Sequence, residues 1–147
     1  MIRKIKKQDK KEIIKLFKSF PSKIQNNLEL ELKQAISNLV EGFILIKEKE
    51  IVGYIILRTW GGVYNIDTLV IKKGFRGFGL GEDLIHFSKK LCIKENIPAI
   101  ITKTFLKEVL PFYKKQGFKE IGQLQGSFVP LDKKRIYLKW TNPQYQE

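Results

Sequence analysis

Apolar residues recur along the first part of the chain at helical spacing, three and four residues apart. This spacing predicts two helices, the first beginning near Asp9 and the second near Ser22. Asp9 with Glu12, and Ser22 with Gln25, are each expected to form a capping box, and Pro21 is expected to end the first helix. The predicted apolar faces comprise Ile13, Leu16, Phe17 and Phe20 in the first helix, and Ile24, Leu28, Leu32, Ala35, Ile36 and Leu39 in the second.

Runs rich in β-branched and aromatic residues flank these helices and predict strands. Residues 1–7 are expected to form an edge strand, and residues 43–47 and 51–60 a hairpin around a short charged link. Gly61-Gly62 predicts a turn, and residues 63–71 the next strand.

The second half of the chain predicts helices that alternate with strands. A helix is expected over residues 79–95, followed by a strand at 99–103, and this unit implies a parallel pair with a right-handed crossover. A short helix is expected over residues 107–116, with Gly117 just past its end. Strands at 118–124 and 135–140 follow. The apolar stripe of the long helix comprises Leu80, Leu84, Phe87 and Leu91.

The most informative segment is the loop that joins the strand at 63–71 to the long helix. It contains Arg76 and three closely spaced glycines, Gly77, Gly79 and Gly81. Glycines let the main chain approach a ligand closely, and the first N–H groups of a helix have no carbonyl of their own to bind. Strand, glycine loop and helix therefore predict a phosphate site, although a plain tight turn is the alternative.

Two common phosphate motifs do not match this loop. No Gly-Lys-Ser/Thr closes the glycine run, so a P-loop is excluded. The dinucleotide fingerprint G-x-G-x-x-G needs its third glycine one position later than Gly81, and it normally opens a parallel-sheet domain.

The spacing R-x-x-G-x-G, at Arg76, Gly79 and Gly81, resembles the acetyl-CoA signature of the GNAT N-acetyltransferase superfamily. A second element agrees, because residues 112–118, FYKKQGF, resemble the tyrosine element that follows in these enzymes. The resemblance covers residues 51–139 well and the first forty residues in outline. It implies an α/β fold: one domain over residues 1–147, with a mixed, mostly antiparallel sheet flanked by about four helices.

Composition limits the class of protein further. The 147 residues are 43% hydrophobic and suffice for one domain with its own core. No apolar run approaches the ~20 residues that span a bilayer, and the charged N-terminus has no signal core. The single cysteine, Cys92, excludes an internal disulfide and a CxxC metal site. We therefore expect a cytoplasmic protein with no resident metal and no membrane partner.

The net charge of +13 raises the alternative of a nucleic-acid-binding protein. Nearly all of the excess is lysine, spread along the whole chain without a long basic block. We rank this alternative last, because a lysine-rich composition alone carries no recognition motif. A basic surface would also help to collect the anionic CoA.

The family resemblance implies acetyl-CoA as the cosubstrate and places its binding site. Main-chain groups of the strand before the loop would contact the acetyl and pantetheine units, and Arg76 would add positive charge. A non-catalytic module that binds or senses CoA is the second alternative. The predicted cofactor-binding residues are Leu69, Val70, Ile71, Arg76, Gly77, Phe78, Gly79, Leu80, Gly81 and Glu82.

Two residues are the catalytic candidates. Tyr113 matches the family tyrosine and would protonate the leaving thiolate, although it could instead be a packed aromatic. Asp67 lies on the strand that leads to the acetyl site, where family members often carry an acidic residue. It is the first candidate for the base that deprotonates the amine, with a water relay or an ordinary exposed carboxylate as alternatives. An amine of pKa ~10.4 is almost wholly protonated near neutral pH, so it needs such help.

Other titratable residues are weaker candidates. Glu108 and Glu120 are secondary candidates for the base. His86 lies opposite the apolar stripe of the long helix and is expected to be solvated, whereas Cys92 on its flank is expected in the core.

The chain departs from the family pattern at two positions. Leu106 stands where many members have an asparagine, and Ile101 is near the place of a glutamate in enzymes that acetylate ribosomal proteins. Both departures weaken any claim of N-terminal protein acetylation. The expected partner is a small-molecule or peptide amine, selected by the two N-terminal helices, Gly61-Gly62 and the loop at 125–134; a homodimer is compatible with the sequence.

Overall fold

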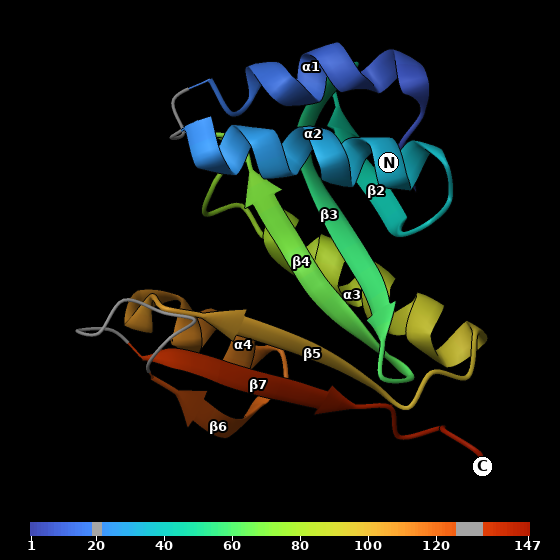
Figure 1. The fold of residues 1–147 in the computed structure, drawn as a ribbon, viewed down its shortest axis with the longest axis vertical. Helices are drawn as coiled ribbons and strands as arrows, with labels where there is room; N and C mark the ends of the chain where they lie inside the picture. Colours follow the sequence, from blue (N-terminus) through green and yellow to red (C-terminus); the bar gives the residue numbers. More distant parts are fainter. Residues whose placement is uncertain (19–21, 126–133) are drawn as a thin grey trace. The chain divides into compact units, whose positions relative to one another are not determined.

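The computed structural model describes residues 1–18, 22–125 and 134–147, and of residues 22–26 it describes the backbone. Seven strands within these residues form one sheet in the order β1-β2-β3-β4-β5-β7-β6 (Figure 1). The described pairings are antiparallel except that of β4 with β5, which confirms the predicted mixed, mostly antiparallel sheet. The strands are β1 (Ile2–Lys4), β2 (Glu41–Lys47), β3 (Glu50–Trp60), β4 (Val63–Ile71), β5 (Ala99–Thr104), β6 (Lys119–Leu124) and β7 (Arg135–Thr141).

Four α-helices are described in the same ranges, as the sequence predicts. None of them has the length and apolarity needed to cross a membrane. They are α1 (Lys10–Lys15), α2 (Ser22–Ile36), α3 (Leu80–Lys94) and α4 (Leu110–Lys115), and the short 3-10 helices η1 (Lys7–Asp9) and η2 (Lys107–Val109) precede α1 and α4.

The contacts of the chain gather into two compact units. The first comprises Met1–Arg58 and Asp67–Phe87, and the second comprises Thr59–Ile66 and Ser88–Glu147. A single domain over residues 1–147 stays a prediction.

The first unit is built around β3, whose residues 51–57 are all buried. Helices α1 and α2 supply apolar side chains to one face, where the ring of Phe17 meets that of Tyr54 edge-on at 5.3 Å. On the other face Phe87 of α3 packs against Phe43 of β2, with ring centroids 4.6 Å apart. The core between the two N-terminal helices and the sheet comprises Ile5, Ile13, Phe17, Leu28, Leu32, Ala35, Val40, Ile44, Ile51, Tyr54 and Ile56.

The start of the chain differs from the predicted capping box. Asp9 is 5% exposed and its carboxylate turns away from α1, accepting from Arg3 Nη1 at 2.8 Å and from the Lys6 N–H at 2.7 Å. Glu12 instead accepts from the Ile51 N–H at 3.2 Å and ties α1 to β3. Burial raises the pKa of Asp9, but these hydrogen bonds outweigh it and the net pKa is lowered.

Helix α1 is also shorter than its apolar spacing predicts. It ends at Lys15, and Phe17 stays buried in the turn that follows. Phe20, Pro21 and the side chains of the Ser22/Gln25 pattern lie outside the described residues.

The buried face of α3 is rotated from the predicted stripe. Leu80 and Leu84 are buried as expected, but Phe87 and Leu91 are half-buried. The fully buried positions are Leu84, Ile85, Ser88 and Cys92. Small polar and sulfur side chains therefore occupy the deepest positions, which a count of large apolar residues does not detect.

The second unit packs α4 and the last part of α3 with β5, β7 and β6. The predicted strands and short helix are present, with β7 paired to both β5 and β6. The Lys89 ammonium donates to the Gln116 carbonyl and lies 5.3 Å from the Trp140 ring. Asn142 Nδ2 donates to the Ile97 carbonyl at 2.9 Å, which holds the end of the chain on this unit.

Helix α4 ends in the predicted glycine motif. Gly117 has a φ of +89°, and its N–H donates to the Lys114 carbonyl at 3.0 Å. The Phe118 N–H donates to the Tyr113 carbonyl at 3.0 Å, so the end is a Schellman motif. The same arrangement ends α2 and α3, where Asn38 and Asn96 take the left-handed position.

Gly53 on β3 allows an unusually close approach of β4. A Cβ at this position would lie 2.7 Å from Ile71 Cδ1 and 2.9 Å from the Val70 carbonyl oxygen. The oxygen belongs to the backbone and cannot move aside alone.

We therefore expect Gly53→Ala to lower stability by about 1–3 kcal/mol, measured by urea unfolding, because β4 must move or the core must be overpacked. Gly122→Ala in β6 is the matched control, since a Cβ there meets no atom within 4 Å. Equal stability of the two variants would contradict the close approach.

Candidate active site

The glycine loop follows β4 and leads directly into α3. Gly74, Gly77 and Gly79 have φ values of +93°, +84° and +78°, which side-chain-bearing residues rarely adopt. A Cβ at any of these three positions would meet no atom within 4 Å. The loop therefore turns an open backbone surface outward, and Phe78 within it is 75% exposed.

The first turn of α3 supplies amides to the same place. The Asp83 N–H makes a hydrogen bond to the Gly79 carbonyl at 3.0 Å. The N–H groups of Leu80, Gly81 and Glu82 come before it and have no carbonyl within the helix to bind. Together with the positive end of the helix dipole, they form an arrangement suited to an anion.

Arg76 holds the glycine loop against the end of β4. Its Nε donates to the Ile71 carbonyl at 3.0 Å, which ties the middle of the loop to the last residue of β4. The terminal guanidinium nitrogens have no partner among the described residues. They could therefore contribute positive charge to a ligand held by the loop.

The predicted acetyl-contacting residues lie at the end of β4. Leu69, Val70 and Ile71 are all half-buried. They lie beyond Tyr64 and Asn65, the two residues of β4 that pair in parallel with β5. Only their main-chain groups are candidates for ligand contact.

Tyr113 lies on α4 in the second unit and is 8% exposed. Its ring packs edge-on against Phe112 and Phe118, with centroids 5.1 and 5.4 Å away, and its hydroxyl makes a hydrogen bond with Thr102 of β5. Burial raises the pKa of the phenol, and the Thr102 bond lowers it by less. The phenol therefore keeps its proton near neutral pH, as a proton donor must.

Asp67 on β4 is engaged in an ion pair. Arg58 Nε of β3 donates to Asp67 Oδ2 at 2.7 Å, and Arg58 Nη2 donates to Gln34 Oε1 of α2 at 2.7 Å. The Asp67 side chain is 18% exposed. One carboxylate oxygen of the first candidate for the base is therefore held by a permanent cation.

Glu31 on α2 is a residue that the sequence interpretation missed. Its Oε2 accepts from the Thr68 hydroxyl of β4 at 2.7 Å. Burial raises the pKa of Glu31 and the Asp67 charge adds to this, while the Thr68 bond and Arg58 oppose it; the net pKa is raised. The available signal was its place beside Leu32, an acidic residue at the edge of an apolar helix face.

The weaker candidates lie in unremarkable surroundings. Glu108 and Glu120 are exposed, and Glu120 accepts from Gln123 Nε2 at 2.9 Å. His86 is solvated as expected and lies 3.8 Å from Glu82. Cys92 is fully buried, and burial raises the pKa of its thiol to about 11, which leaves it unreactive.

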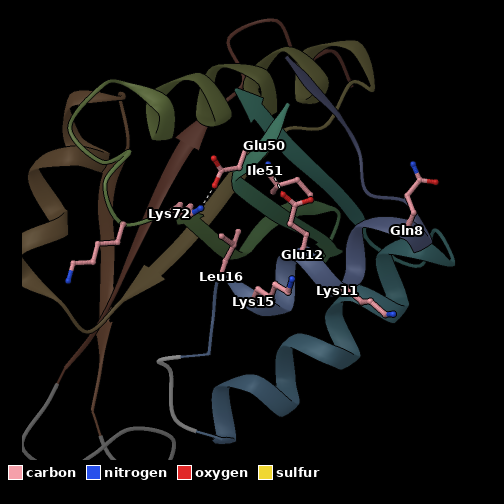
Figure 2. Close-up of a pocket in the computed structure, with 9 residues that line it drawn as sticks. Gln8, Lys11, Glu12, Lys15, Leu16, Glu50, Ile51 and Lys72 are labelled. Atoms are coloured by element: carbon pink, nitrogen blue, oxygen red, sulfur yellow. Dashed lines mark hydrogen bonds and ion pairs between the residues drawn. The ribbon is translucent and has the colours of Figure 1, made fainter. Parts of the chain in front are cut away.

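A pocket of about 590 Å³ lies in the first unit where α1, the start of β3 and the residues after β4 meet (Figure 2). Glu50 pairs with Lys72, and Glu12 is held by the Ile51 N–H. Four lysines and two glutamates are among the lining residues, so the pocket carries a net positive charge. None of the predicted site residues lines it; its lining comprises Gln8, Lys11, Glu12, Lys15, Leu16, Glu50, Ile51, Lys72 and Lys73.

The elements expected to select the acceptor are described in part. Gly61 and Gly62 form the predicted turn with φ values of +62° and +78°. Residues 126–133 of the predicted loop lie outside the described residues.

The mixed sheet and an outward glycine loop at the start of the long helix define an α/β protein built to hold a phosphate-bearing ligand. Residues 5–127 match the model of the acetyltransferase (GNAT) domain. The chain therefore belongs to the GNAT acetyltransferase family, as its motifs indicate.

Solved structures support this fold. An aminoglycoside 6'-N-acetyltransferase complexed with coenzyme A is 16% identical, with a TM-score of 0.84 over 100% of this chain and 99% of that one. The ribosomal-protein-S18-alanine N-acetyltransferase from Escherichia coli is 14% identical, with a TM-score of 0.79 over 100% and 96%. A streptothricin acetyltransferase structure from Bacillus anthracis, in complex with acetyl coenzyme A, is 25% identical over 69% and 62%, with a TM-score of 0.65. A comparison with curated proteins gives no match.

Because the folded state raises the pKa of Glu31, it binds a proton there more tightly than the unfolded chain does. The ionised carboxylate therefore opposes folding at pH above its folded pKa, and this penalty disappears as the pH falls below the ordinary value. We expect Glu31→Gln to raise Tm at pH 7.5 by about 1–3 °C, measured by calorimetry. The exposed Glu29 of the same helix provides the control: Glu29→Gln should leave Tm within 1 °C or so. A lower Tm for Glu31→Gln alone would contradict the unfavourable burial.

Proposed function

We propose that this GNAT protein moves the acetyl group of acetyl-CoA directly to a primary amine. The observation that carries the proposal is the open glycine loop at the first turn of α3 in a chain of this family. The left-handed glycines and the unpaired amides suit the diphosphate of CoA, and a structural neighbour was crystallised with that molecule.

The cofactor would be held mainly by main-chain groups. The amides of residues 77–82 would bind the diphosphate, with Arg76 adding charge from the base of the loop. The main chain of Leu69, Val70 and Ile71 would align the thioester and polarise its carbonyl. The exposed ring of Phe78 would cover part of the bound CoA.

Transfer would proceed through a tetrahedral intermediate. The neutral amine attacks the thioester carbonyl carbon, the C–S bond breaks, and the thiolate of CoA leaves; the proton that the new amide nitrogen loses restores the donor of the thiolate proton. Tyr113 would donate its phenolic proton to that thiolate, because its raised pKa keeps the proton available near neutral pH. Asp67 lies on the strand that leads to this centre, and its ion pair with Arg58 leaves it a positioning role.

The acceptor belongs to the class of primary amines, on a small molecule or a peptide. Neighbouring structures include enzymes named for aminoglycosides and for a ribosomal-protein alanine. This chain has Ile101 near the place of the glutamate found in enzymes that acetylate ribosomal proteins, and Leu106 in place of the asparagine of many family members. We therefore favour a small amine over a protein N-terminus.

The cellular setting is proposed to be the cytoplasm, because the one cysteine is free and buried. A homodimer remains compatible with this proposal, and no contact here argues for it. A nucleic-acid partner would have to bind through scattered lysines alone.

Millimolar acetyl-CoA is expected to raise Tm by about 3–8 °C, because it binds the folded chain alone. Gly79→Val should abolish this shift, since a branched side chain would fill the open space and strain a φ of +78°. Gly61→Val is the control, because Gly61 has a similar φ of +62° and equally open surroundings outside the loop. Scanning calorimetry with and without ligand measures both; an unchanged shift in Gly79→Val would place the ligand elsewhere.

Tyr113→Phe is expected to lower kcat about 10–100-fold while the acetyl-CoA shift in Tm is retained, because proton donation is lost and binding is not. The assay is thiol release from acetyl-CoA with a panel of polyamines, aminoglycosides, amino acids and peptides. Tyr145→Phe in the exposed tail is the control. A non-catalytic CoA module would release no thiol with any amine and would bind acetyl-CoA normally.

A further inference from the structure

A cluster of polar side chains lies between α2 and the strands β3 and β4 of the first unit. Thr68 donates to Glu31 at 2.7 Å, and Arg58 joins Asp67 to Gln34 with two hydrogen bonds of 2.7 Å each. Thr68 and Asp67 are consecutive on β4, yet both are joined to partners on α2, Asp67 through Arg58. The cluster therefore gathers the acidic groups of two elements at one place.

The charges of this cluster do not balance. Asp67 is neutralised by Arg58, whereas Glu31 is bound by a neutral hydroxyl. Two carboxylates and one guanidinium leave one uncompensated negative charge in a chain of net charge +13. A half-buried carboxylate without a cation of its own is costly, and an added ammonium would compensate it.

A second observation points to the same place. The hydroxyl of Tyr54 is buried, and it is the one such side-chain atom in the described residues without a hydrogen-bond partner. Tyr54 itself is 0% exposed. Tyr54 and Arg58 are four residues apart on β3, so their side chains lie on the same face of the strand. Burial, and next the negative charge of Glu31, raise the pKa of the Tyr54 phenol. A buried hydroxyl without a partner is costly, and a water brought in with a bound polar ligand would satisfy it.

The cluster lies beside the proposed reaction centre along the strand. Thr68 immediately precedes Leu69, and a strand advances about 3.3 Å per residue. The Glu31 carboxylate, held on Thr68, is therefore within roughly 3–10 Å along the strand of the main-chain groups of residues 69–71. The near end of this range, beside Leu69, is a distance that an attacking amine or one water can bridge.

We propose that Glu31 is the acceptor-binding carboxylate and the proton acceptor of this enzyme. Its free oxygen binds the ammonium group of the acceptor and takes one proton from it, which leaves a neutral amine and a protonated carboxyl. The amine nitrogen then forms its bond to the acetyl carbon to give the tetrahedral intermediate, and the C–S bond breaks as this intermediate collapses. The CoA thiolate takes a proton from Tyr113, and the second proton of the attacking nitrogen passes to the Tyr113 phenolate, which restores the phenol. This assignment rests on the proposed function and names the residue that performs its proton transfer.

Asp67 then has a different role from that of the base, which its position in the sequence suggests. Its oxygen is held by Arg58, so it is a positioning residue whose charge tunes Glu31. Among the residues whose side chains the structure describes, the charged and titratable groups that act on Glu31 are Arg58 and Tyr54 on β3 and Asp67 on β4. Asp67 raises the pKa of Glu31 and Arg58 lowers it, so the two substitutions have opposite expected effects.

The test compares kcat/KM as a function of pH with spermidine as the probe amine. Glu31→Gln keeps an acceptor for the Thr68 hydroxyl and should lower kcat/KM about 100-fold or more, with the acetyl-CoA shift in Tm retained. Glu29→Gln makes the same change of charge two residues away, at an exposed position, and should match the wild type. In the plot of kcat/KM against pH, the rise on the acidic side should move to lower pH in Asp67→Asn and to higher pH in Arg58→Gln, because Asp67 raises the pKa of Glu31 and Arg58 lowers it.

A second measurement does not depend on turnover. In protein labelled with ¹³C at glutamate side-chain carboxyls, the Glu31 resonance is assigned by its loss in Glu31→Gln. Spermidine should shift this resonance and lower the pH at which it titrates, because a bound cation favours the ionised carboxylate.

The outcomes separate the two proposals. The role of Glu31 is overturned if acetyl transfer proceeds with equal kcat/KM in Glu31→Gln and Glu29→Gln. It is also overturned if the acidic side of the pH profile moves in neither Asp67→Asn nor Arg58→Gln. Both outcomes leave the acetyltransferase proposal intact. A resonance that responds to spermidine in a protein that acetylates no amine supports the amine site and overturns the transfer. A resonance that does not respond overturns the amine site.

Discussion

The central strand β3 imposes the main constraint on this protein, because its residues 51–57 are buried on both faces. A strand of this kind needs cover on each side, and α1 and α2 provide it on one face while α3 provides it on the other. The positions of the glycine loop and of the polar cluster in the first unit both follow from this arrangement. The glycine loop is the connection that brings the chain from β4 to the covering helix α3, and the polar cluster forms where α2 crosses the strand ends.

The main elements of the fold were predictable from the sequence because local signals agreed with tertiary packing. β-rich runs, Gly61-Gly62 and Gly117 gave the strands, the turn and the helix end close to their observed bounds. The signals failed where a side chain has a partner, or a packed position, that the pattern of its own helix does not show. Asp9 has the spacing of a helix cap, but a guanidinium and an amide just before the helix compete for its carboxylate. The deepest positions of α3 include Cys92, as predicted, but also Ser88, a polar residue that apolar periodicity cannot identify.

The glycine loop and the acceptor side of the candidate site were predictable from the sequence to different degrees. The loop could be identified because glycine spacing reports directly on backbone conformation, and Gly77 and Gly79 do take left-handed values. The acceptor side could not be identified in the same way. Whether Asp67 or Glu31 is paired with a cation depends on Arg58, and nothing in the local sequence says which carboxylate that arginine reaches.

Gly53 links the packing of the core to the start of the glycine loop, and this link has a consequence for evolution as well as for stability. Its missing side chain leaves room for Ile71, the residue whose carbonyl Arg76 holds at the start of the glycine loop. The next residue, Lys72, is fixed by its N–H to the Val52 carbonyl at 2.7 Å. The direction in which the chain leaves the sheet is thus set by an absent atom eighteen residues upstream of Ile71. A mutation at this inconspicuous position would therefore change how the glycine loop is presented without changing any residue of the loop itself.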